Sequence, residues 1–414
     1  MEEIQILQNQ TNAEELEKSY RSDPEKFKIA FNNVYEKTNK SELLDFWHIR
    51  LNYKENKNSF SNRKELFTVI ILSIIAGLAM KLPFIFELNE ELFYTRNVGF
   101  ISFSLISIYF AIKNQLSFMQ MAMIGLVNIL SLIYINLLPP INNSDSINLA
   151  TVHMVLFLWG MLAYAFFGNQ FKNLESRMNF LKYNGDLVVL NALMLIAGGI
   201  LTGITIGLFS LIGLNIENFY FENIAIFGLA ALPIVGTYII QNNSNLVSKI
   251  SPLIAKIFSP LVLIMLSIYL ISIVYTGKDP YNDREFLLLF NVLLIGVMAL
   301  IFFSVAGYSN KIKSDYEIWV LFLLSLLSII ISLIALSAIL FRINEWGFTP
   351  NRTAVLVTNI LILVHMILVD IKLFKVLTNK AEKESIGESI AEYLPLYFIW
   401  SVIVVFLFPI IFGV

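Results

Sequence analysis

Long apolar stretches separated by short polar segments dominate the chain from about residue 66 onward. A helix that crosses the hydrocarbon core of a membrane needs about 20 mostly apolar residues, because its backbone polar groups must be satisfied within the segment. The pattern predicts eleven membrane-spanning helices, over residues 66–86, 98–112, 118–138, 147–167, 187–213, 221–240, 253–275, 286–307, 318–340, 354–374 and 395–413. The second of these predicted spans is the shortest.

Residues 1–65 have a different, more polar pattern. A helix start at Pro24 is followed by apolar residues at helical spacing, and a second set begins after Ser41. These sets predict a helical hairpin and comprise Phe27, Ala30, Phe31, Val34 and Tyr35, then Leu43, Phe46, Trp47 and Leu51. The expected fold is therefore all-α, with a cytoplasmic helical head over residues 1–65 and a transmembrane helical bundle over residues 66–414.

Two roles remain open for the predicted head. It either caps the membrane body or itself, or it docks a protein partner or the inner leaflet of the membrane. The second role is suggested by Phe46 and Trp47, which stand near basic residues. These basic residues are Arg50, Lys54, Lys57, Arg63 and Lys64.

Composition narrows the classes of protein. Of the 414 residues, 57% are hydrophobic and 14% are charged, whereas a soluble domain carries about 25% charged residues. A net charge of −2 provides no basic field for nucleic acid, so no nucleic-acid partner is expected. The absence of cysteine excludes disulfides and thiolate metal sites, and no motif for a metal, a cofactor or a catalytic group is visible.

Positive charge is distributed unevenly between the predicted loops. If residues 1–65 lie inside, the inner loops carry nine lysines and arginines, the outer loops carry five, and residues 1–65 add eleven to the inner side. Cytoplasmic loops are enriched in these residues. The count predicts a multi-pass protein of the cell membrane with a cytoplasmic N-terminus and, for an odd number of spans, Val414 outside.

Few ionisable side chains lie inside the predicted spans, where such groups are costly and mark functional candidates. Asp370 and Lys256 lie at matching depth near the inner ends of the tenth and seventh spans, so they either form an ion pair or reach the inner interface separately. His365 lies near mid-membrane, off the helical face of Asp370. It is either a hydrogen-bonded packing residue or a residue that relays protons or contacts substrate.

A glycine ridge marks the fifth predicted span. Gly199, Gly203 and Gly207 recur every four residues and line one helix face, which predicts close packing of another helix. The alternative is a flexible path for a substrate, together with Pro233 and Pro260 in the sixth and seventh spans. On that alternative, the functional site lies between the fifth, sixth, seventh and tenth spans.

The segment between the ninth and tenth predicted spans has the local chemistry of a turn. Gly347 suits the positive φ of a turn, Thr349 suits a helix cap, and Pro350 suits the first turn of the tenth span.

Two interpretations of this turn remain open. In one, the chain simply reverses direction and Arg342 pairs with Glu345. In the other, Arg342, Glu345 and Arg352 form an outward-facing site for an anionic head group or substrate, aided by the positive end of the following helix.

The same turn carries a resemblance to a known family. Its residues fit the pattern E-[YW]-G-[FL]-T-x-x-R at Glu345, Trp346, Gly347, Phe348, Thr349 and Arg352. With its helical head and many spans, the chain resembles the bacterial polytopic membrane proteins grouped as domain of unknown function 4153, from about residue 66 onward. Trp346 departs from the tyrosine expected there. The resemblance implies a bacterial inner-membrane protein and brings no substrate or activity with it.

Three classes of function are compatible with these observations. The many spans, the glycine ridge and the prolines favour a transporter or a lipid-handling permease, with membrane lipids as partners. A sensor or assembly scaffold would use residues 1–65 to contact a protein partner. A membrane-embedded enzyme is less favoured, because no nucleophile, paired acids or histidine cluster is visible.

The predicted topology can be tested with reporter fusions in the segment over residues 169–186, for example at Lys182. The positive-inside count predicts a cytoplasmic signal there. A signal from outside the membrane would overturn the whole assignment of sides.

Overall fold

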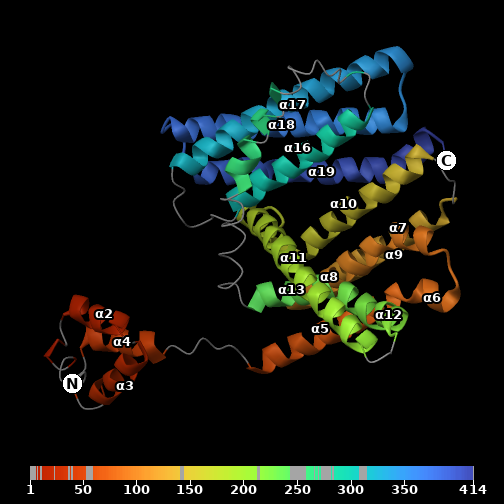
Figure 1. Cartoon of the computed structure of the whole chain (residues 1–414). Coiled ribbons are helices and arrows are strands. Elements are labelled where there is room, and N and C mark those ends of the chain that lie inside the picture. The colour runs from red at the N-terminus through yellow and green to blue at the C-terminus, as the bar shows by residue number, and fades with distance from the viewer. Residues whose placement is uncertain are drawn as a thin grey trace. The chain divides into compact units, whose positions relative to one another are not determined.

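The computed structural model describes residues 6, 8–9, 12–22, 24–35, 38, 41–52, 59–139, 144–211, 215–242, 258–264, 266–268, 270–271, 281, 284–306 and 315–413. Every regular element in that part of the chain is a helix, which confirms the expected all-α fold (Figure 1). The chain divides into two compact units, Met1–Glu65 and Leu66–Val414.

Among its described residues, the first unit contains the two predicted helices, α3 (Pro24–Tyr35) and α4 (Glu42–Asn52), and a further helix before them, α2 (Ala13–Ser22). The added helix α2 is polar overall and contributes one fully buried aliphatic residue, Leu16, to the core of this unit. Trp47 is buried in the core of this unit, whereas Phe46 is 59% exposed. Of the two aromatic residues suggested for docking, only Phe46 therefore faces solvent.

Most of the described residues of the second unit belong to helices. They are α5 (Ser59–Met80), α6 (Leu82–Phe86), α7 (Glu90–Gly99), η1 (Phe100–Ser104), α8 (Leu105–Lys113), α9 (Phe118–Leu137), α10 (Asp145–Phe167), η2 (Gly168–Gln170), α11 (Leu174–Leu211), α12 (Glu217–Tyr220), η3 (Phe221–Ala225), α13 (Ile226–Asn242), α16 (Arg284–Ala306), α17 (Asp315–Trp346), α18 (Pro350–Leu377) and α19 (Glu384–Ile411). The elements η1 and η3 are single turns of π-helix.

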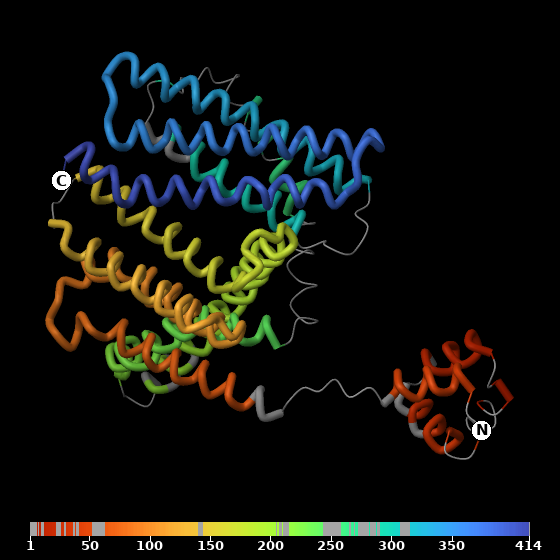
Figure 2. The backbone as a smooth tube through the Cα atoms, turned by 180° about the vertical axis from the view of Figure 1, so that it is seen from behind, coloured from red at the N-terminus to blue at the C-terminus, as the bar shows by residue number. Residues whose placement is uncertain are grey.

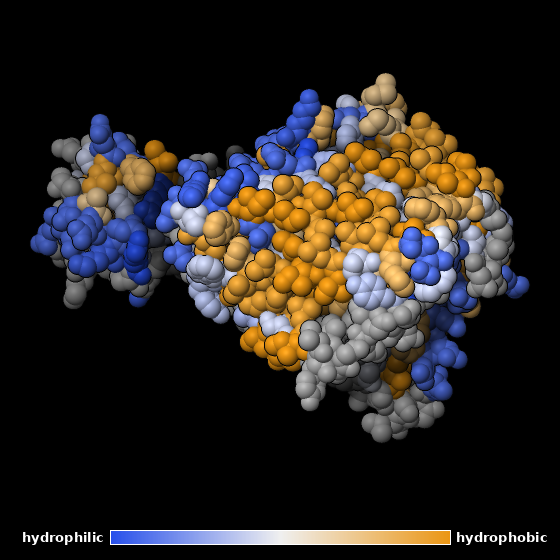
Figure 3. Space-filling view, turned by 90° about the horizontal axis from the view of Figure 1, so that it is seen from above, coloured by the Kyte–Doolittle hydropathy of each residue, from blue (hydrophilic) through white to orange (hydrophobic). Residues whose placement is uncertain are grey.

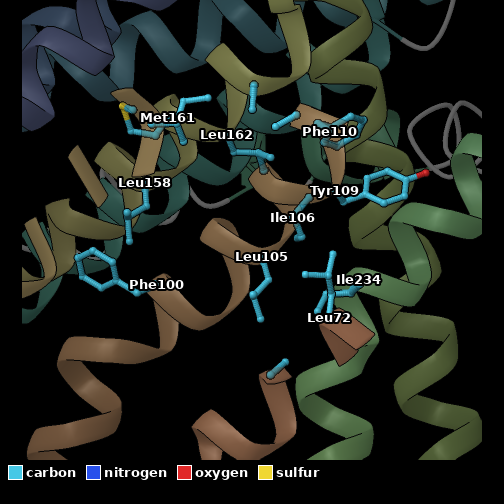
Figure 4. Packing of buried hydrophobic residues seen from close by; sticks show 14 of the residues in the cluster. Leu72, Phe100, Leu105, Ile106, Tyr109, Phe110, Leu158, Met161, Leu162 and Ile234 are labelled. Carbon is cyan, nitrogen blue, oxygen red and sulfur yellow. The ribbon is translucent and has the colours of Figure 1, made fainter. Parts of the chain in front are cut away.

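Two hydrophobic cores organise this unit. The first is centred on α8 and α10 and includes residues of α5 and α13, as Figure 4 shows for Tyr109, Leu162, Leu72 and Ile234. The second lies among α16, α17, α18 and α19. Figures 1 and 2 show α16, α17, α18 and α19 on one side of α10 and α11, and α5, α8 and α9 on the other side. Trp159 of α10 packs against both cores.

Eight helical stretches in the described residues are long and apolar enough to cross a membrane. They match the second to sixth and the ninth to eleventh predicted spans. They are Glu90–Lys113, Phe118–Leu137, Asp145–Gln170, Leu174–Gly203, Glu217–Asn242, Asp315–Trp346, Pro350–Leu377 and Glu384–Ile411. The first and eighth predicted spans correspond to α5 and α16. About half of the seventh lies outside the described residues, and the described part contains a shorter apolar helix over Phe258–Ile268. The total of eleven therefore stays a prediction.

Several predicted boundaries are wrong, including the start of the eleventh span, which is Glu384 rather than residue 395. The first span ends at Met80 rather than at residue 86, because Pro83 in the first turn of α6 interrupts the helix. The second begins at Glu90 and is therefore not short. The predicted loop over residues 169–186 is mostly helix, because α11 begins at Leu174 and its polar side chains find partners. Asn184, for example, accepts a hydrogen bond from the indole N–H of Trp159 at 2.9 Å.

Hydrogen bonds join chain segments that alternating spans would place on the same side. The Lys81 ammonium donates to the side chain of Asn223 at 2.6 Å, and the Ser146 hydroxyl donates to the carbonyl of Gly413 at 2.9 Å. These contacts agree with spans that alternate in direction across the membrane. The side that faces the cytoplasm stays a prediction.

The surface of the second unit is strongly apolar. Figure 3 shows hydrophobic side chains over much of the face that it draws. Phe118 is 83% exposed and Leu137 is 78% exposed, at opposite ends of α9. Such extended apolar surface is unfavourable in water and suits lipid. The helices and this surface fit a multi-pass integral membrane protein.

Arg96 explains how the second span accommodates a charge. Its side chain is 6% exposed, and its guanidinium donates to the carbonyls of Leu138 at 2.7 Å and Pro139 at 3.1 Å. These carbonyls directly follow α9, where helical carbonyls lack partners within the helix. Arg96 falls in the predicted outer loop between the first and second spans, but in the structure it is a buried residue that binds the end of α9.

We expect Arg96→Ala to lower the free energy of unfolding in detergent by about 1.5–3 kcal/mol, because the carbonyls that follow α9 lose a charged donor. Denaturation monitored by circular dichroism measures the change. Arg63→Ala is the matched control, because Arg63 is exposed on α5. Equal effects of the two substitutions would contradict the assigned role of Arg96.

Candidate functional site

Asp370 lies at a pocket near the C-terminal end of α18. The hydroxyl of Ser325 on α17 donates to Oδ1 of Asp370 at 2.5 Å and holds the carboxylate against that helix. The pocket has a volume of ≈350 Å³, and Lys375 and Lys380 contribute to its wall with Asp370. Phe322 and Phe374 supply apolar surface. One carboxylate, two ammonium groups and aromatic rings therefore share one cavity.

The predicted pair of Asp370 with Lys256 lies partly outside the described residues, because Lys256 belongs to the segment over residues 251–257. The pairing stays a prediction. The described partner of Asp370 is Ser325, which the sequence analysis did not single out because 45 residues separate the two.

His365 is fully buried in an aromatic cluster. Its Nδ1 lies 3.1 Å from the hydroxyl oxygen of Tyr397, and its ring stacks on Tyr393 with 4.3 Å between the ring centroids. The Tyr397 hydroxyl donates to the sulfur of Met298 at 3.3 Å, so Nδ1 of His365 carries the hydrogen in this network. These contacts favour the packing role of His365 over a proton relay.

The turn between α17 and α18 has the predicted local chemistry. Gly347 has a φ of 76°, the hydroxyl of Thr349 accepts from the backbone N–H of Arg352 at 3.3 Å, and Pro350 begins α18. The Arg352 guanidinium donates to the carbonyls of Trp346 and Gly347, each at 2.8 Å. It therefore binds the free carbonyls at the end of α17.

The predicted pair of Arg342 with Glu345 is not formed. Arg342 instead donates to the carbonyl of Tyr281 at 2.9 Å, and Glu345 is exposed. The guanidinium groups of Arg342 and Arg352 lie 5.8 Å and 5.6 Å from the centre of the Trp346 ring. Because backbone carbonyls and an aromatic face already engage both cations, this geometry favours a structural turn over an anion-binding site.

Gly199 and Gly203 of the glycine ridge do not pack closely against another described segment of the chain. Gly199 and Gly203 are exposed, and a β-carbon on either would meet open space, so the expectation of close helix packing there is wrong. Gly207 belongs to α11, but its contacts lie outside the described residues. Close approach occurs elsewhere. A β-carbon at Gly160 of α10 would overlap the ring of Phe398 on α19.

The expected site between the fifth, sixth, seventh and tenth spans is not assembled in the described residues. The fifth and sixth spans meet through Tyr183 and Thr237, whose hydroxyl groups lie 2.7 Å apart. His365 packs instead against Phe302 of α16 and against α19. Neither Gly203 nor His365 lines the pocket at Asp370. A buried acid, Asp186, falls in the predicted loop over residues 169–186, whereas in the structure it lies in α11 and is 4% exposed.

The structure contains a second cavity, an apolar groove, for which the sequence gives no local signal. It has a volume of ≈510 Å³ and lies among α5, α7, η1, α8 and α9. Most of its wall is aliphatic or aromatic, and no charged side chain lines it. Its hydroxyl and amide groups bond within the protein: Ser104 donates to Oδ1 of Asn128 at 3.0 Å, and Nδ2 of Asn128 donates to the carbonyl of Ile124 at 2.8 Å.

The π-helical turn η1 contributes Phe100, Ile101 and Ser104 to this groove. A π-helical turn widens the spacing of a helix locally and is often found at functional sites. Its occurrence depends on packing in three dimensions, and the apolar sequence of this span carries no local signal for it.

Comparisons with known proteins give no family for this chain, because no protein-family model, curated protein or solved structure matches it. The resemblance of the turn around Gly347 to domain of unknown function 4153 therefore stays a prediction. In the described part of the chain, no group of three or more histidines or acidic residues could hold a metal ion.

The structural role of Arg352 predicts the effect of reversing its charge. Arg352→Glu places a carboxylate against two carbonyl oxygens, so we expect a loss of about 2–4 kcal/mol in the free energy of unfolding, measured in detergent. Glu345→Arg is the control, because Glu345 is exposed in the same turn, and its stability should change little. Unchanged stability of Arg352→Glu would refute the role of Arg352 at the end of α17.

Proposed function

We propose that this integral membrane protein handles lipid, and that the apolar groove between α5 and α9 holds an acyl chain. The single observation that supports this function is the chemistry of the groove wall. A volume of ≈510 Å³ lies within the range of about 300–1,000 Å³ that is typical of small-molecule pockets. Because no charged side chain lines the groove, the molecule that occupies it should be apolar along the part that contacts the wall.

The polar groups in the wall point to the same class of ligand. Asn97 is engaged in a reciprocal amide pair with Asn136, at 3.1 Å and 2.8 Å, and Ser107 donates to the carbonyl of Phe103 at 2.7 Å. Side chains that already bond within the protein contribute little to binding a polar substrate. A long apolar molecule would instead gain from removing its surface from water.

The residue types that line the groove also support lipid handling over catalysis. Its wall contains no histidine, acid or lysine, so it offers no general acid or base. Within the transporter or permease class suggested by the many spans, a substrate that is itself a membrane lipid would account for this composition.

Gly125 offers a direct test, because a β-carbon there would meet open space while Gly125 lines the groove. We expect Gly125→Phe to fill the groove and to reduce photolabelling by a diazirine-acyl phospholipid about tenfold, since overpacking costs about 1–3 kcal/mol. Mass spectrometry of the peptides that contain residues 97–132 measures the labelling.

Gly296→Phe is the matched control for this experiment. Gly296 lies on α16, is exposed and also has open space around it, but it does not line the groove. Its labelling pattern should equal that of the unmodified protein. Undiminished labelling of Gly125→Phe in these peptides would refute the proposed function.

A further inference from the structure

The pocket at Asp370 is chemically unlike the apolar groove and shares no lining residue with it. The pocket lies where α18 ends, and the hydroxyl of Thr378 closes the helix by donating to the carbonyls of Phe374 and Lys375 at 2.9 Å and 3.2 Å. This end of a spanning helix would meet the level of the lipid head groups. A ligand there can be both charged and apolar.

The charged groups of the pocket remain available to a ligand. Lys375 and Lys380 are exposed, and neither forms an ion pair with a described residue. Asp370 accepts a hydrogen bond from Ser325 but likewise has no basic partner among the described residues. The pocket thus holds two cations and one anion that do not neutralise one another directly.

This combination is complementary to a zwitterion with an apolar tail. Ammonium groups attract a phosphate, a carboxylate accepts hydrogen bonds from a primary amine, and aromatic rings such as Phe322 and Phe374 contact an acyl chain. A purely anionic head group would satisfy the lysines but would bring negative charge close to Asp370. A head group that carries its own ammonium avoids that repulsion.

We propose that the pocket binds a phospholipid with a primary-amine head group of the phosphatidylethanolamine class. Lys375 and Lys380 hold the phosphate, Asp370 accepts hydrogen bonds from the amine, and Phe322 and Phe374 contact the first part of an acyl chain. This proposal does not rest on the function assigned to the apolar groove, because different residues carry it.

The test uses the full-length protein in mild detergent and measures bound lipid by native mass spectrometry. Phosphatidylethanolamine, phosphatidylcholine and phosphatidylglycerol with the same acyl chains are the probes. We expect the unmodified protein to bind phosphatidylethanolamine about tenfold more tightly than phosphatidylcholine, whose methylated amine cannot donate a hydrogen bond. Asp370→Asn should abolish this preference while still accepting a bond from Ser325.

The lysines are tested separately, in a variant whose changes are confined to exposed side chains. Lys375→Gln with Lys380→Gln should weaken binding of all three lipids about tenfold, because the phosphate loses its charged donors. Lys372→Gln is the control, because Lys372 lies on the same helix end but does not line the pocket. Gly125→Phe should leave this binding unchanged, which separates the result from that for the groove.

Several results would overturn the proposal. An unchanged preference in a folded Asp370→Asn variant would remove the amine contact, and a double lysine variant that behaves like Lys372→Gln would remove the phosphate contact. Tighter binding of phosphatidylglycerol than of phosphatidylethanolamine would indicate a simple basic site. Equally effective competition by water-soluble glycerophosphoethanolamine would show that the acyl chain contributes nothing and that the ligand is not a lipid.

Discussion

The hydrocarbon interior of a membrane offers no hydrogen-bond partner to a peptide group, and most of this structure follows from that constraint. Each long apolar segment satisfies its backbone internally as a helix. The unsatisfied groups are thereby confined to helix ends. Two arginines are positioned at such ends, Arg96 at the carbonyls that follow α9 and Arg352 at those that end α17. Both arginines therefore bind backbone carbonyls at helix ends.

The same constraint determines how the helices associate. Apolar side chains gain little from leaving lipid for one another, so close packing of small residues becomes important. In α17, small residues that are almost fully buried form a stripe along the helix, and α18 packs closely beside it. This stripe comprises Ser325, Ser328, Ser332, Ala335 and Ala338. The exposed glycines of α11 do not have this role within the chain, although their spacing is the more familiar packing pattern.

The two cavities differ in chemistry because they differ in their position along the helices. The apolar groove lies along the bodies of α8 and α9, where a charged wall would be expensive, and its hydroxyl and amide groups bond to one another or to backbone. The pocket at Asp370 lies beside a helix end, where lysines can extend toward water. One cavity therefore suits an acyl chain, and the other suits a head group together with part of its chain.

The sequence by itself determined the features that depend on neighbouring residues. Apolar length predicted the helices, and Gly347, Thr349 and Pro350 predicted the turn between α17 and α18, because φ preference and helix capping act over a few positions. Only the tertiary structure decided which side chains meet. The contact of Asp370 with Ser325 and the groove beside η1 join segments that are distant in the sequence. Helical periodicity identifies a face of a helix, and the packing of the other helices decides what that face contacts.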